Sequence, residues 1–138
     1  MVAEEKIVET REWLTKAHQD LLSANWLLSS PDALYNIVGF HSQQAAEKTL
    51  KGYLTWYEVP FEKTHSLVAL VGKCLSFDQN FNDLREAAVT LTPYAVSFRY
   101  PGDLPELTLQ EAEIAYKLAQ HVWDTLSTKL PSETLPPR

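Results

Sequence analysis

Four polar residues, His41, Gln44, Lys48 and Lys51, lie three, four and three positions apart within the segment FHSQQAAEKTLKGYL. In an α-helix this spacing places them along one face, which we call the basic line. The two ammonium groups would suit a phosphate or carboxylate, the imidazole could transfer a proton, and Gln44 could bind a base edge. Because an unpaired buried ammonium group is costly, we expect the basic line to face a cleft, a partner or a ligand.

A purely structural role is also open for each of these side chains. Lys48 and Lys51 could extend to solvent or pair with Glu47 and other carboxylates. His41 could be a satisfied, half-buried histidine, and Gln44 could belong to a buried hydrogen-bond network. The remaining histidines have no second ligand at the spacing of a metal site, and no cofactor motif occurs, so we expect neither metal nor cofactor.

The elements that position these residues are all predicted to be helices. Apolar residues recur at helical spacing, and no segment has the pattern of a strand. Pro93 should kink or end the fourth helix, and a capping box at Thr108–Glu111 should start the last one. Short connections favour an all-α fold, an up-down bundle of four to five helices. The expected helices cover about 10–29, 32–57, 65–75, 80–96 and a last segment from 108.

The composition is that of one ordinary domain of 138 residues. We expect the bundle to occupy residues 1–130, and residues 131–138, with three prolines, to form a disordered tail. The net charge of -6 argues against general nucleic-acid binding through the backbone but allows a local basic pocket. A single cysteine excludes an internal disulfide. The sequence shows no signal peptide and no apolar run of about 20 residues, so we expect a soluble, cytoplasmic protein.

Two further segments join the basic line in a family pattern. Gln44-Ala45-Ala46-Glu47-Lys48 with Lys51 after it, then Thr64-His65-Ser66-Leu67, then Arg99-Tyr100-Pro101 follow one another in an order that resembles HEPN-domain proteins. The resemblance implies a four- to five-helix bundle, commonly a homodimer. It also implies a minimal nucleotidyltransferase encoded nearby, as in toxin–antitoxin pairs. Many HEPN proteins are ribonucleases, and others bind nucleotides without cleaving RNA.

The ribonuclease pattern is incomplete in this chain. Ribonuclease members carry an arginine followed after four to six residues by a histidine. If Arg99 is that arginine, the corresponding positions hold Leu104, Pro105 and Glu106. Metal-independent cleavage would then need a proton-transferring imidazole from elsewhere, such as His41 or His65.

Arg99 and Tyr100 each have two interpretations. The planar fork of Arg99 suits phosphate or carboxylate, or it could anchor its loop through Asp103 or Glu47. Tyr100 could stack on a nucleobase or pack its loop against the bundle.

Three functions therefore stay open. The leading hypothesis is a nucleotide- or RNA-binding module that acts with a separate nucleotidyltransferase chain. The first alternative is a metal-independent ribonuclease toxin that uses Arg99 and His41. The second is a non-catalytic interaction module whose basic line docks on acidic residues of a partner. The candidate binding residues are Lys48, Lys51, Arg99, Gln44, His41 and Tyr100.

Overall fold

The computed structural model describes residues 2–76, 78–95, 101–102 and 105–137. These residues contain five α-helices and three short 3-10 helices but no strand, which confirms the all-α prediction. The α-helices are α1 (Ala3–Leu28), α2 (Tyr35–Trp56), α3 (Leu67–Leu75), α4 (Arg85–Leu91) and α5 (Leu109–Ser127). The 3-10 helices are η1 (Gln79–Leu84), η2 (Thr92–Ala95) and η3 (Ser132–Thr134).

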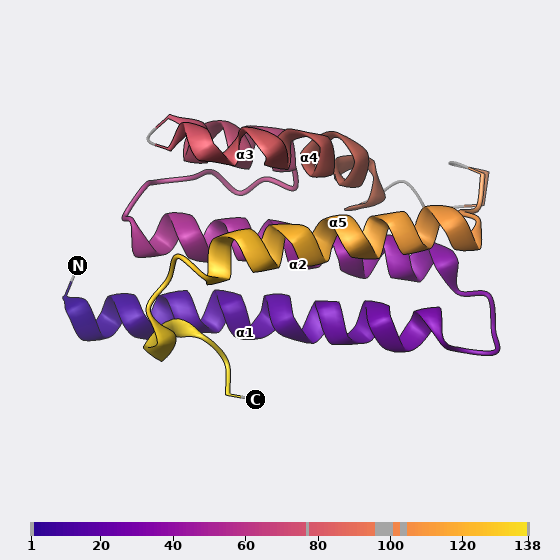
Figure 1. Ribbon diagram of the computed structural model, residues 1–138, viewed down its shortest axis with the longest axis horizontal. Coiled ribbons are helices and arrows are strands. Elements are labelled where there is room, and N and C mark those ends of the chain that lie inside the picture. The colour runs from indigo at the N-terminus through magenta and orange to yellow at the C-terminus, as the bar shows by residue number, and fades with distance from the viewer. Residues whose placement is uncertain (1, 77, 96–100, 103–104, 138) are drawn as a thin grey trace.

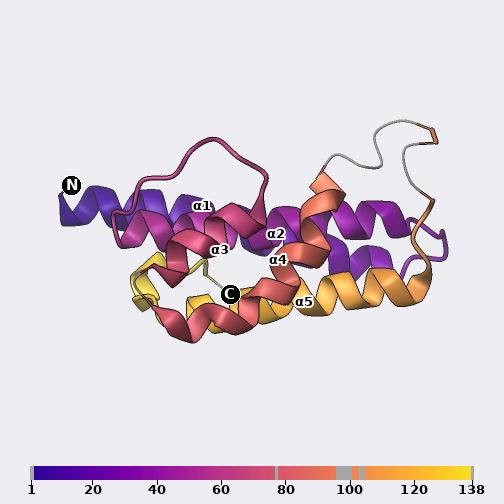
Figure 2. The same ribbon diagram turned by 90° about the horizontal axis from the view of Figure 1, so that it is seen from above.

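Three long helices form the body of the bundle. Figure 1 shows α1, α2 and α5 lying side by side, with α3 and α4 along one side of α2 and α5. From above, α4 slants across that side of the bundle (Figure 2). None of the described helices has the length and apolar character needed to span a lipid bilayer.

Small side chains allow close packing between α1 and α2. A Cβ atom added to Gly52 of α2 would lie 2.9 Å from Leu14 Cδ2 and 3.2 Å from Trp13 Cβ. Ala17 of α1 and Ala45 of α2 are fully buried. Because the two backbones approach closely, a polar side chain on one of these helices lies a short distance from the other helix.

α1 begins earlier than the periodicity predicted. It starts at Ala3 rather than near Thr10. Glu4 and Glu5 favour the positive end of the helix dipole. The Lys6 ammonium lies 4.2 Å from the ring centroid of Trp56, so the extra turns pack against α2.

The predicted fourth helix is divided into η1, α4 and η2. Asp78 caps the first piece by accepting a hydrogen bond from Asn80 N. α4 ends at Leu91, two residues before Pro93, as the proline predicted.

The C-terminal segment differs from the expected disordered tail over its described part, 131–137. Residues 132–134 form η3, whose Thr134 is fully buried. Arg11 Nε of α1 donates to the carbonyl oxygen of Glu133 at 2.8 Å, and Arg11 Nη2 donates to the same oxygen. Proline restricts the unfolded chain, which lowers the entropy lost on ordering such a segment.

Candidate functional site

One carboxylate of α1 holds two polar side chains of α2. Asp20 Oδ1 lies 2.8 Å from His41 Nδ1, and Lys48 Nζ donates to Asp20 Oδ2 at 2.7 Å. His41 and Lys48 are seven positions apart, two helical turns, so both project toward α1. The side chain of Asp20 is 12% exposed, whereas those of His41 and Lys48 are 27% and 24% exposed. We call these three residues the Asp20 cluster.

The Asp20 cluster presents oriented donors to solvent. With Nδ1 of His41 donating to the carboxylate, Nε2 is left to accept or, when the ring is protonated, to donate. Within the described residues Nε2 has no hydrogen-bond partner. Lys48 uses one of its three N–H groups on Asp20, and its other two can bind an anion.

A second carboxylate, Glu47, is buried and contacts three polar side chains, of which His65 is largely exposed. Glu47 accepts hydrogen bonds from Gln43 Nε2 at 3.1 Å and Lys51 Nζ at 3.1 Å, and its Oε1 lies 2.8 Å from His65 Nδ1. The side chains of Glu47 and Lys51 are only 4% and 8% exposed. The four residues Gln43, Glu47, Lys51 and His65 are named here the Glu47 cluster.

Lys51 is surrounded by protein rather than by solvent. Its ammonium lies 5.5 Å from the ring centroid of Trp13 and 5.9 Å from that of Phe61. Its charge is therefore balanced by Glu47 and by two aromatic rings. The burial of Lys51 favours the structural role considered above, in which Lys51 pairs with Glu47.

The structure divides the basic line between two acids. His41 and Lys48 join the Asp20 cluster, and Lys51 joins the Glu47 cluster. Gln44 Nε2 donates to Gln43 Oε1 at 2.7 Å and so lies in the hydrogen-bond network. The ammonium groups thus have partners inside the chain.

Asp20 is the site residue that sequence reasoning missed. It is only 8% exposed and lies three positions after Ala17 and four before Ala24, both fully buried. An acid on the apolar stripe of a helix must have a polar partner, because an isolated buried charge is costly. The place of Asp20 on the apolar stripe of α1 was therefore the sequence signal that could have identified it.

Arg99 and Tyr100 lie outside the described residues. Two described residues farther along the chain, Tyr94 before that segment and Leu107 after it, both lie against Gly39 of α2. A Cβ added to Gly39 would lie 2.7 Å from Leu107 Cδ1 and 3.3 Å from Tyr94 Cδ2. Gly39 is two positions before His41, so the two residues lie on different sides of α2.

The cysteine does not offer a nucleophile. Cys74 is fully buried, and desolvation together with Asp78 raises the pKa of its thiol to about 12. The thiolate is the reactive form, so Cys74 is inert near neutral pH. Among the residues described, no group of three His, Cys, Asp or Glu side chains could hold a metal ion.

Comparisons with known proteins identify related chains. The model of the HEPN domain matches residues 10–129. The crystal structure of TT1696 from Thermus thermophilus is 34% identical and superposes with a TM-score of 0.75, covering 88% of this chain and 98% of that one. The structure of ST0689, an archaeal HEPN homologue, is 24% identical with a TM-score of 0.70, covering 87% of this chain and 96% of its own, and shows the shared fold. No curated protein matches this chain.

Proposed function

Because the chain belongs to the HEPN family, we propose that it binds a nucleotide or an RNA phosphate at the Asp20 cluster and acts with a separately encoded minimal nucleotidyltransferase. The observation that carries the proposal is the shared carboxylate. Asp20 fixes His41 and Lys48 on α2, two turns apart, while each keeps about a quarter of its side chain exposed.

The cluster has the donors that a phosphate group requires. Two N–H groups of Lys48 and the Nε2 of a protonated His41 can each donate to a phosphate oxygen. Their positions are set before binding by Asp20, which reduces the entropy lost when a ligand is bound. Lys51 is not part of this site in the proposal, because Glu47 already holds its ammonium group inside the bundle.

Arg99 and Tyr100 complete the proposed site. Both residues lie outside the described part of the chain, and they enter this proposal through the family pattern alone. We assign Arg99 to the phosphate and Tyr100 to stacking on the base.

Calorimetry with AMP, ATP and a short single-stranded RNA tests the binding. The parent chain should bind at least one of these ligands, and Lys48→Ala and Arg99→Ala should each weaken that binding about tenfold or more. Lys117→Ala, which removes an exposed lysine of α5, is the matched control and should bind like the parent. Circular dichroism should show unchanged helicity in all three variants.

Two results would overturn the binding proposal. One is a parent chain that binds none of the three ligands. The other is a Lys48→Ala variant that binds as tightly as Lys117→Ala.

The partnership is tested separately from ligand binding. The chain should co-purify with the product of an adjacent gene that carries the Gly-Ser and paired-Asp pattern of a nucleotidyltransferase. Lys48→Glu should abolish co-purification if the docking surface includes the Asp20 cluster. Failure to co-purify removes the partnership and leaves the binding proposal standing. The homodimer that the family resemblance implies is measured by light scattering on the parent chain.

A second function, metal-independent RNA cleavage, is favoured by the contact between Asp20 and His41. A carboxylate on Nδ1 orients the ring and leaves Nε2 to accept a proton from a ribose 2′-hydroxyl. Cleavage in the presence of a chelator should then be lost in His41→Gln and strongly reduced in Asp20→Asn. His121→Gln, which changes an exposed histidine of α5, should cleave like the parent. Intact RNA after incubation with the parent chain would refute cleavage but not binding.

A further inference from the structure

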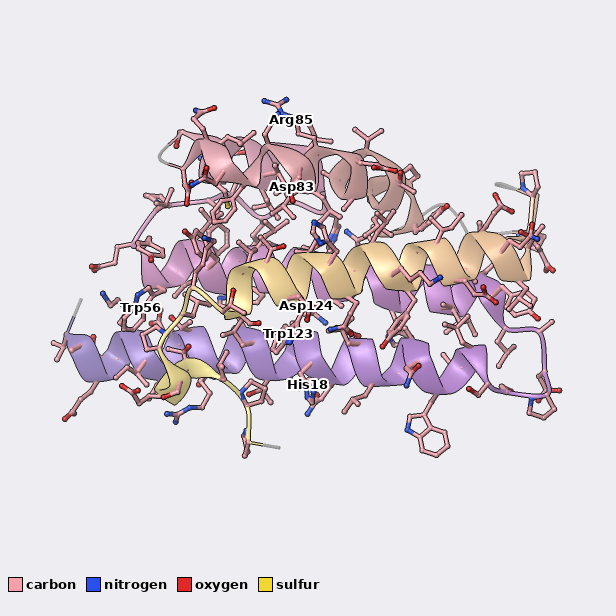
Figure 3. All side chains as sticks on the ribbon, in the orientation of Figure 1. His18, Trp56, Asp83, Arg85, Trp123 and Asp124 are labelled. Carbon is pink, nitrogen blue, oxygen red and sulfur yellow. The ribbon has the colours of Figure 1, made fainter. Side chains whose placement is uncertain are left out.

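A hollow of about 400 Å³ lies where α1, the end of α5 and the C-terminal segment meet. The hollow is lined by His18 of α1, by Trp123, Asp124, Ser127 and Thr128, and by Leu135 and Pro136. Figure 3 labels Asp124 and Trp123 along α5 and His18 on the neighbouring α1. His18 is two positions from Asp20, so the two side chains point to different sides of α1 and the hollow is separate from the Asp20 cluster.

Two aromatic rings form one wall of the hollow. The His18 and Trp123 ring centroids are 5.6 Å apart, with planes inclined by 35°. Within the described residues the ring nitrogens of His18 have no hydrogen-bond partner. The electron-rich face of an indole attracts a cation, and an unprotonated imidazole nitrogen can accept a hydrogen bond.

A hydrogen-bonded chain along α5 orients the carboxylate of Asp124, the residue after Trp123. Tyr116 Oη donates to Gln120 Oε1 at 3.2 Å, and Gln120 Nε2 donates to Asp124 Oδ1 at 2.9 Å. Over the described parts of the chain, Oδ2 of Asp124 has no hydrogen-bond partner. One oxygen is therefore occupied in orienting the group, and the other remains for a ligand.

The charges at the hollow select a cation. Asp124 carries the only carboxylate among the described residues that line the hollow, and none of those residues is a lysine or an arginine. An anion would meet repulsion from Asp124 with no counter-ion, whereas a cation would meet a carboxylate and an aromatic face. Thr128 Oγ1 donates to the backbone oxygen of Asp124 at 3.1 Å and keeps its lone pairs for a second contact.

We propose that this hollow binds a primary ammonium group. An ammonium has three N–H donors, and the described lining of the hollow carries acceptors for them on Asp124, Thr128 and His18, with the Ser127 hydroxyl beside them. A guanidinium is a poorer match, because its fork prefers both carboxylate oxygens and Gln120 already occupies one. The ammonium comes either from a free alkylamine or from a lysine side chain of another protein.

NMR titration of the full chain tests the proposal, with the Trp123 indole N–H as the reporter. The signal is assigned by its loss in Trp123→Phe. Butylammonium and N-acetyl-lysine methylamide are the probes, and they separate the two sources of the ligand. Tighter binding of the capped lysine indicates a lysine side chain, and tighter binding of butylammonium indicates a free amine.

The charge requirement is tested by Asp124→Asn, which keeps the shape of the side chain. This variant should bind the better probe about tenfold more weakly than the parent. Asp83→Asn is the matched control, because it removes another exposed aspartate, on η1, and it should bind like the parent. Asp83 is labelled in the upper layer of Figure 3, apart from the hollow.

Three outcomes would overturn the proposal. They are a parent chain without saturable shifts in the millimolar range, an Asp124→Asn variant that binds like Asp83→Asn, and equal binding of butanol, which carries no charge. Arg138 lies outside the described residues and is positively charged. Each titration is therefore repeated in Arg138→Ala, where we expect the same order of affinities for the probes.

Discussion

The buried pair of Glu47 and Lys51 provides the sharpest test of the structural reasoning. Their side chains are 4% and 8% exposed and their charged atoms are 3.1 Å apart. Glu47→Gln keeps the shape of the side chain but leaves the Lys51 ammonium without a counter-ion. Breaking one partner of a buried pair costs about 3–5 kcal/mol. The remaining amide oxygen and the rings of Trp13 and Phe61 still contact Lys51, so we expect a loss near the lower end, about 3 kcal/mol.

Lys51→Met should cost less than Glu47→Gln. It removes one of three donors from Glu47 while Gln43 and His65 stay in place, and the methionine fills a similar volume. We expect a loss of about 2 kcal/mol. In the double variant neither residue carries a charge, so the combined loss should fall short of the sum by at least about 1 kcal/mol.

Urea denaturation followed by circular dichroism measures these free energies of unfolding. Asp83→Asn is the control, since the exposed pair of Asp83 and His121 should contribute within about 0.5 kcal/mol. A loss in Glu47→Gln no larger than that in Asp83→Asn, or two single losses that add without coupling, would contradict a stabilising buried pair.

Three further changes test local features. Thr92→Val should lower the free energy of unfolding by about 1–2 kcal/mol in urea, because Thr92 Oγ1 accepts from Leu67 N at 3.1 Å and a valine leaves that N–H unpaired; an unchanged midpoint would contradict this. Thr108→Ala should cost about 1 kcal/mol by the same measurement, because Thr108 and Glu111 form a capping box at the start of α5, and Thr108→Ser should restore most of it. Burial raises the pKa of Cys74 to about 12, above the value of about 8.5 in an unfolded chain, so the native state keeps a proton that the unfolded state releases. The protonated Cys74 thiol makes its full contribution to the free energy of unfolding below a pH of about 8.5, and this contribution is lost as the pH rises toward about 12. Between pH values of about 8.5 and 10, the free energy of unfolding should therefore fall more steeply in the parent than in Cys74→Ala.

The helices were predictable where the apolar stripe and a capping or turn residue indicated the same helix boundary. The capping box at Thr108 and Glu111 correctly marks the start of α5. The first turns of α1 were not predictable from periodicity, because they are stabilised by long-range contacts such as Lys6 on Trp56. Residues 132–134 were misjudged for the same reason, since Arg11 binds Glu133 from 122 positions away.

The candidate site was predictable only in part. Helical spacing placed His41 and Lys48 on one face of their helix, and the structure confirms that both project toward the same partner. Their partner, Asp20, is 28 positions from Lys48, and a single sequence does not reveal which helices pack together. Lys51 follows the same spacing but turns to Glu47, four positions earlier on its own helix. Spacing alone could not decide between these two acids.

The pairing of Lys48 with Asp20 has a consequence for how a ligand would arrive. A cation beside its own counter-ion has an electric field that cancels within a short distance, and the whole chain carries a net charge of -6. The net negative charge would repel an anionic ligand at long range, so its association rate should rise modestly as salt screens that charge. Recognition at this site would therefore depend on close fit after a diffusive encounter.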